Sequence, residues 1–192
     1  MVGIVDYGFD SKSSLALALQ ELEIDYKVTN DEFFITKCSH IILPDTKDIV
    51  SAIKQLNISN LFNFLRICKK PVLGISAGLK IMCDYAGEEN RACLGIFPLS
   101  TNRFQENLSR NLFTLKRREN YTSPLLHNIP PESEFYFNHI LDFPCNIYAS
   151  ACIKELDSIC AIVEKDNFHA IHFCPEYSGK QGLTVINNFL NI

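Results

Sequence analysis

Apolar residues in the first half of the chain form short continuous runs separated by segments with helical spacing. Val2–Val5 is the first such run, and Ser13 or Ser14 then caps a segment whose leucines recur on one helical face. Three further apolar runs predict strands over Tyr26–Thr29, His40–Leu43 and Val72–Ile75. Strands that alternate with helices in this way predict a parallel sheet covered on both faces.

Two segments flanking the last of these strands have the spacing of amphipathic helices. The first begins at Ile49 and continues through Leu61–Leu65 to Lys70, where Pro71 ends it. The second follows the strand directly, over Ala77–Tyr85. Both are expected to cover the sheet with their apolar faces.

The second half of the chain has a different pattern. Four strand-like runs follow one another closely, over Phe135–His139, Asn146–Ser150, Ile159–Val163 and His169–Phe173. Close strands without intervening helices predict antiparallel hairpins, and a final helix begins after Ser178. No repeat or linker interrupts the chain. We therefore expect one α/β domain over residues 1–192, with a mostly parallel central sheet, helices on both faces and a C-terminal antiparallel extension.

Charge and composition exclude several classes of function. Lys and Arg number 18 against 22 Asp and Glu, which gives a net charge of −4, and the basic residues are dispersed. Such a chain has no basic face for a phosphate backbone, so we expect no nucleic-acid partner. No run approaches the roughly 18 apolar residues of a membrane span. We expect a soluble, cytoplasmic protein with no membrane partner.

Eight cysteines are distributed along the chain, at Cys38, Cys68, Cys83, Cys93, Cys145, Cys152, Cys160 and Cys174. No two of them form a Cys-x-x-Cys pair, so the sequence supports neither a zinc ribbon nor a redox dithiol. We expect most of them to be reduced residues of the core, and no metal ion or cofactor.

One turn carries candidate chemistry. Gly74–Gly78 reads Gly-Ile-Ser-Ala-Gly where a buried strand becomes a helix. Glycines flanking a central residue allow a sharp bend that presents its side chain beside helix N–H groups, which stabilise an oxyanion. Nucleophile elbows of this kind occur with Ser in α/β-hydrolases and with Cys in class I glutamine amidotransferases. The alternative is a glycine-rich turn with an incidental Ser76.

Motifs elsewhere favour the second group. Cys174–Glu176 follows a predicted strand and resembles the His-Pro-Glu signature of class I glutamine amidotransferases. Further blocks resemble the glutaminase subunits of imidazole glycerol phosphate synthase in the same order, at Val2–Gly8, Ile41–Pro44, Lys70–Gly78, Leu94–Pro98, Tyr136–His139 and Ser178–Leu183. The resemblance spans essentially the whole chain and implies the flavodoxin-like amidotransferase fold.

The resemblance also assigns a catalytic triad, in which two members are changed. Ser76 stands at the position of the nucleophilic Cys, Cys174 at that of the general base His, and Glu176 at that of the orienting Glu. A hydroxyl is a much weaker nucleophile than a thiolate and needs a positioned base. A thiol has no second nitrogen with which to relay a proton and hold a carboxylate.

Positions that the resemblance assigns to substrate binding are changed as well. Asp45, Thr46 and Lys47 replace the Gly-Val-Gly oxyanion loop, and Lys80 replaces a Gln that contacts glutamine, whereas Gly78 is retained. Loss of both loop glycines makes the amide-presenting backbone conformation less accessible. We therefore expect glutaminase activity to be reduced or lost.

The resemblance implies a (β/α)₈-barrel cyclase partner that uses ammonia from L-glutamine, in histidine biosynthesis or in amidation of surface sugars. A non-catalytic structural or regulatory subunit is one alternative. Binding of another small ligand is a second, with Lys80 and a helix N-terminus holding an anion. A third is a serine hydrolase in which His172 or His139 serves Ser76. A metal site from His169, His172, Cys174 and Glu176 is disfavoured, because strand alternation places only some of them on one side.

Overall fold

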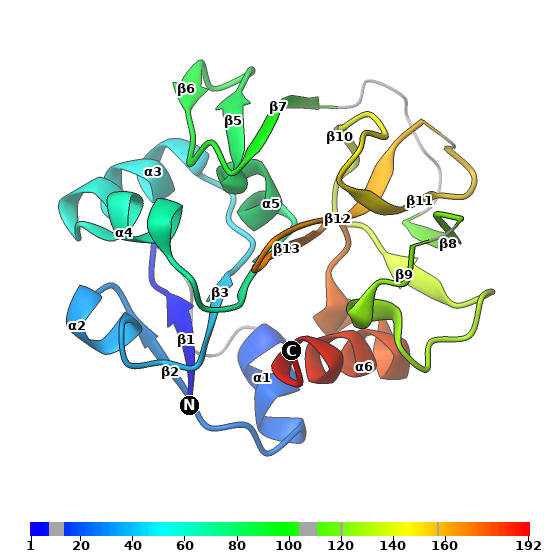
Figure 1. Cartoon of the computed structure of the whole chain (residues 1–192), viewed down its shortest axis with the longest axis horizontal. Coiled ribbons are helices and arrows are strands. Elements are labelled where there is room, and N and C mark those ends of the chain that lie inside the picture. The colour runs from blue at the N-terminus through cyan, green and yellow to red at the C-terminus, as the bar shows by residue number, and fades with distance from the viewer. Residues whose placement is uncertain (8–13, 104–110, 120, 157) are drawn as a thin grey trace.

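The computed structural model describes residues 1–7, 14–103, 111–119, 121–156 and 158–192 (Figure 1). Within these residues, nine strands form the main sheet in the order β2-β1-β3-β4-β13-β12-β11-β8-β9. Their bounds are β1 Val2–Val5, β2 Tyr26–Thr29, β3 His40–Leu43, β4 Val72–Ile75, β8 Leu112–Arg117, β9 Glu134–Tyr136, β11 Ala149–Ile153, β12 Cys160–Lys165 and β13 Phe168–Ile171.

The first five strands of this order run parallel. β1, β4 and β13 are buried along their whole length, as expected of strands covered on both faces. Because parallel strands end at the same edge of a sheet, β3, β4 and β13 deliver Asp45, Ser76 and the segment 172–176 to one place. That edge carries the candidate site.

Helices cover both faces of the sheet, as predicted (Figure 1). Two lie on one side, α1 Ser14–Glu21 and α6 Gly179–Leu190, and their apolar faces join one core cluster. On the other side lie α2 Glu32–Ile35, α3 Ile49–Ile58, α4 Leu61–Ile67 and α5 Ala77–Met82. Ser13, one of the two predicted cap residues of α1, lies outside the described residues.

The predicted helix from Ile49 to Lys70 is two helices in the structure. Asn60 has a left-handed backbone with φ 61°, which ends α3 and precedes α4. The predicted helix Ala77–Tyr85 is also too long, because β5 begins at Cys83. Periodicity alone could not place either break.

The antiparallel extension is confirmed, since β12, β11, β8 and β9 follow β13 in antiparallel order. The strand predicted over Asn146–Ser150 instead begins at Ala149. The Asn146 side chain accepts from the Tyr148 N–H at 2.8 Å and so forms a turn there.

A second sheet was not predicted; among the described residues it comprises β5 Cys83–Ala86, β6 Arg91–Ala92, β7 Phe97–Arg103 and β10 Leu141–Asp142. The described residues also include two 3₁₀ turns, Pro124–Leu126 and Pro175–Tyr177.

The cysteine prediction, that most of these residues are reduced and in the core, is confirmed, with one pair as the exception. Six cysteines are free and buried in the part of the chain that the structure describes, as expected of reduced core residues. Cys145 and Cys152 instead form a disulfide. The pair is seven residues apart, and the turn before β11 returns the chain so that the two side chains meet. No described helix is both long enough and apolar enough to span a membrane.

Candidate functional site

The turn after β4 has the geometry of a nucleophile elbow. Ser76 adopts φ 51° and ψ −106°, a conformation that a residue other than glycine rarely takes and that functional sites tolerate. The two glycines that flank Ser76 leave room for this turn. A Cβ on Gly78 would lie 2.1 Å from the Leu43 carbonyl oxygen, and a Cβ on Gly74 would lie 2.8 Å from the Gly78 carbonyl carbon. Gly78, predicted to bind substrate, therefore allows α5 to pack closely on β3.

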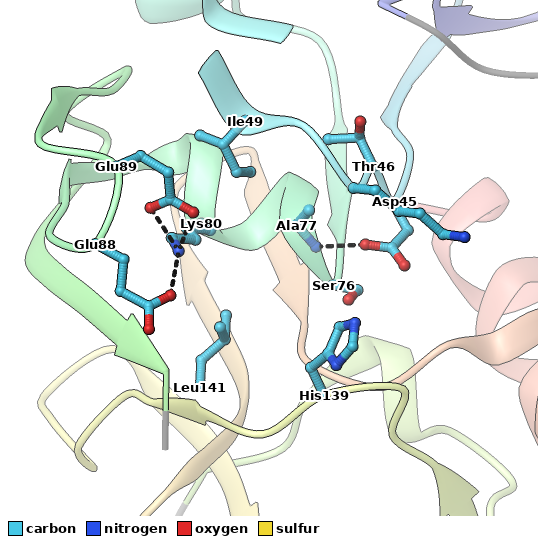
Figure 2. Close-up of a pocket in the computed structure, with 11 residues that line it drawn as sticks. Asp45, Thr46, Ile49, Ser76, Ala77, Lys80, Glu88, Glu89, His139 and Leu141 are labelled. Atoms are coloured by element: carbon cyan, nitrogen blue, oxygen red, sulfur yellow. Dashed lines mark hydrogen bonds and ion pairs between the residues drawn. The ribbon is translucent and has the colours of Figure 1, made fainter. Parts of the chain in front are cut away.

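The amide after the elbow residue is occupied by a carboxylate. The Ala77 N–H, in the position of an oxyanion-hole donor, donates to Asp45 Oδ1 at 3.0 Å. Asn138 Nδ2 lies 3.5 Å from Asp45 Oδ2 on the other side. Figure 2 shows the Asp45 side chain pointing from the loop after β3 toward α5. A fixed negative charge thus lies where an oxyanion would otherwise be stabilised.

Ser76 and Cys174, the first two positions of the assigned triad, contact each other. Both side chains are buried, Cys174 to 1% exposure, and they lie next to each other. Burial raises the pKa of the Cys174 thiol far above its usual value, and the charges of Glu176 and Asp45 raise it further. A pKa raised in this way favours the protonated form of the thiol.

Glu176, at the third position, lies where the charged form of its carboxyl is disfavoured. Burial raises its pKa to about 7, and the nearby charge of Asp45 contributes to the rise. Its Oε2 atom has no hydrogen-bond partner among the described residues. An imidazole would supply a cation and a strong donor here, whereas Cys174 supplies no cation and only a weak S–H donor.

A pocket of about 230 Å³ opens beside Ser76, with Asp45, Thr46, Lys47, Lys80 and His139 among its lining residues (Figure 2). Lys80 reaches it from α5 and is only 5% exposed in its side chain, so it does not face solvent. Its Nζ lies 2.8 Å from both carboxylate oxygens of Glu89 and 3.8 Å from Glu88. The cation is therefore already neutralised, which disfavours the predicted use of Lys80 to hold an anion.

The sequence matches the family model for glutamine amidotransferase class-I over residues 3–192. The chain belongs to the class-I glutamine amidotransferase family. Imidazole glycerol phosphate synthase subunit HisH of Buchnera aphidicola subsp. Schizaphis graminum is 31% identical, with 100% of this chain and 99% of that protein covered. Subunit HisH 2 of Legionella pneumophila strain Lens is 29% identical, covering 100% and 98%.

Solved structures share the fold. A crystal structure of a glutamine amidotransferase has a TM-score of 0.78 at 16% identity, covering 99% of this chain and 97% of that one. The structure of PurLQS from Thermotoga maritima has a TM-score of 0.66 at 18% identity, covering 99% of this chain and 97% of the matched chain. These two comparisons support the fold alone.

Of the two histidines that could serve Ser76 in a serine hydrolase, only His139 faces the pocket. The His172 ring is fully buried: Nε2 accepts from the Leu141 N–H at 2.8 Å, and Nδ1 lies 2.9 Å from the Cys160 carbonyl. Both ring nitrogens are thus engaged away from Ser76. His139 is exposed and lines the pocket, and Figure 2 shows its ring turned toward Ser76.

The fold brings together the three positions assigned to the triad and the first residue of the altered loop. It does not assemble the disfavoured metal set, because His169 pairs with Glu164 at 3.0 Å and His172 is engaged as described. The sequence did not predict that Asp45 accepts a hydrogen bond from the first amide of α5, nor that Asn138 contacts Asp45. It also did not predict that Glu88 and Glu89 pair with Lys80, for which their adjacent positions in the sequence were the only signal.

Proposed function

We propose that this chain is a class-I glutamine amidotransferase subunit that no longer hydrolyses L-glutamine at the rate of its family. It acts as a non-catalytic subunit beside a (β/α)₈-barrel cyclase, which takes ammonia from solution. The proposal rests on one observation above all, the Asp45 carboxylate on the Ala77 amide.

The position of that carboxylate opposes the chemistry directly. Amide hydrolysis develops negative charge on the carbonyl oxygen, and the amide after the elbow residue stabilises that charge. Here the same N–H already donates to Asp45, and a second negative charge beside it would be repelled. Loss of one oxyanion donor alone lowers turnover by about 10²–10³-fold.

The nucleophile is not activated either. Ser76 needs a base within hydrogen-bonding reach, and its contact is the protonated thiol of Cys174. Loss of nucleophile or base from a triad lowers turnover by about 10⁶-fold, with effects that do not add. Both defects lead us to expect ammonia release far below ordinary enzyme rates.

A role beside a cyclase is supported by the relatives, whose names make them subunits of imidazole glycerol phosphate synthase and which this chain matches from end to end. Retention of the fold with loss of the chemistry suits a structural or regulatory subunit. Histidine biosynthesis is the pathway that these names favour over surface-sugar amidation.

The first experiment measures ammonia release from L-glutamine by the purified chain, alone and with a cyclase. We expect turnover at least about 10⁴-fold below the common range of roughly 1–10³ s⁻¹. The Ser76→Ala variant should release the same residual amount. Ammonia release in the ordinary range that Ser76→Ala abolishes would overturn the proposal.

A gain-of-function series locates the defect. The triple variant Asp45→Gly, Ser76→Cys, Cys174→His restores the family residues at the elbow, base and first loop position. We expect it to exceed the unmodified chain by at least about 100-fold, with each single variant near background, because nucleophile and base act as a unit. A folded triple variant without any gain would place the defect elsewhere.

The cyclase role has its own test. Size-exclusion chromatography of the chain mixed with a barrel cyclase should give a joint peak, and the cyclase should turn over with ammonium in that complex. Absence of any complex at micromolar concentrations would favour a stand-alone ligand-binding role instead.

A serine hydrolase is a second candidate, favoured by His139 lying in the same pocket as Ser76. A fluorophosphonate probe distinguishes it, since a nucleophilic Ser76 would be labelled and His139→Ala would abolish the label. We expect no label, because Ser76 lies beside a thiol of raised pKa and the oxyanion amide is occupied.

A further inference from the structure

Three cysteines that take no part in the elbow pocket gather at one point on the antiparallel extension. The sulfur atoms of Cys145, Cys152 and Cys160 all lie within 4.8 Å of one another. Cys145 is exposed, Cys152 is partly buried and Cys160 is buried, so the cluster reaches from the core to the surface. Such convergence of soft ligands is the donor set that thiophilic metal ions prefer.

Backbone pairing of two strands and a loop creates the cluster. Cys152 on β11 and Cys160 on β12 are direct cross-strand partners. The loop carrying Cys145 runs along the start of β12, where the Cys145 N–H donates to Ser158 at 2.8 Å and the Cys160 N–H donates to Phe143 at 2.8 Å. These hydrogen bonds hold the backbone of the three cysteines close together.

We propose that Cys145, Cys152 and Cys160, when reduced, bind one Zn²⁺ ion through three thiolates. Zinc–sulfur bonds of about 2.3 Å place the sulfurs of such a site about 4 Å apart, so the joined sulfurs of Cys145 and Cys152 would have to separate after reduction, while Cys160 already lies within 4.8 Å of both. Three protein ligands leave one coordination position open, on the side of the exposed Cys145. On binding, the metal displaces three thiol protons, which pass to solvent.

The surroundings of Cys160 suit a ligand. Asn146 Nδ2 donates to its sulfur at 3.5 Å, and such outer contacts orient metal ligands and stabilise the thiolate. In the metal-free state the thiol donates to the Pro144 carbonyl at 3.2 Å. The same loop therefore holds the sulfur in place in both states.

The disulfide is the oxidised form of this cluster. Joining Cys145 to Cys152 removes two electrons and two protons from the thiols and takes away two of the three ligands. A reductant, such as a phosphine or a dithiol, returns two electrons and restores the donor set. Metal binding is thus expected of the reduced protein only.

The experiment titrates the full-length chain with Cd²⁺ and with Co²⁺, whose thiolate complexes have charge-transfer absorption bands. The protein is first reduced with a phosphine, under anaerobic conditions. We expect one equivalent of either metal to give thiolate-to-metal absorption, Zn²⁺ to displace it, and the oxidised protein to give none. Cys145→Ser, Cys152→Ser and Cys160→Ser should each weaken binding at least tenfold, whereas the buried Cys93→Ser elsewhere in the fold should not.

Two results would overturn the proposal: no charge-transfer band in the reduced chain, or a band of equal affinity in Cys160→Ser, which would leave only a two-thiol site. Circular dichroism checks that each variant is folded. Should the buried Cys160→Ser fail to fold, the exposed Cys145→Ser still decides whether binding depends on this cluster. Glutamine hydrolysis is not part of this readout, so the two proposals fail independently.

Discussion

Glu176→Gln should stabilise the folded chain at alkaline pH and leave it unchanged at acidic pH. The carboxyl is buried beside Asp45, and its pKa is raised to about 7 from 4.5. Between these pH values the folded chain holds a proton that the unfolded chain has released. Stability therefore falls as pH rises through this window, and the full cost remains above pH 7.

The magnitude follows from the difference between the two pKa values. One pKa unit corresponds to about 1.4 kcal/mol, so ionising Glu176 in the fold costs on the order of 3 kcal/mol at pH 8. Glutamine has the same shape without the charge and removes this cost. For a chain of this size the gain corresponds to a rise in Tm of roughly 5–10 °C.

Thermal unfolding by circular dichroism at pH 5 and pH 8 measures the effect. Glu134→Gln, at an exposed carboxyl on β9, is the matched control for the removal of one carboxylate charge. Asp45→Asn should reduce the Glu176 effect, because the Asp45 charge contributes to the raised pKa. A Glu176→Gln variant that is less stable than the unmodified chain at pH 8, or equally shifted at both pH values, would refute the reasoning.

Three further outcomes are expected. Glu89→Gln should lower the free energy of unfolding in urea by about 2–3 kcal/mol, because it leaves the buried Lys80 charge without its 2.8 Å partner. Glu88→Gln should lower it by under about 1 kcal/mol, because Glu88 is half-exposed and lies 3.8 Å from Lys80. Gly78→Ala should lower the melting temperature, because the added Cβ forces the Leu43 carbonyl of β3 away. The loss in free energy of unfolding should be about 1–3 kcal/mol or more. An unchanged melting temperature would contradict this close packing. Burial lowers the pKa of His172 to about 4, so its ring should titrate near pH 4 in NMR. Because the unfolded chain takes up this proton at higher pH, stability should fall as pH falls from 6.5 to 4. An NMR midpoint near 6.5 would contradict the burial of this ring.

Much of the fold could be read from periodicity. The buried runs of β1, β3 and β4, the final helix and the antiparallel extension lie where apolar patterns placed them, because local propensity and burial agree there. Errors fell where one residue decided the outcome. Asn60 divides the helix predicted from Ile49 to Lys70, and the Asn146 turn delays β11. A single left-handed residue or side-chain turn leaves almost no trace in a hydrophobic pattern.

The site divides in the same way. Sequence alone determined that the elbow carries Ser76 and that the position of the general base carries Cys174, because these are properties of single positions in a motif. Only the tertiary structure decided that Asp45 binds the amide of Ala77, 32 residues away. It alone also placed Glu89 on Lys80 and brought three cysteines from separate segments together. Such contacts depend on which strand ends and loops meet in space, and chain pairing sets that after the local patterns have been satisfied.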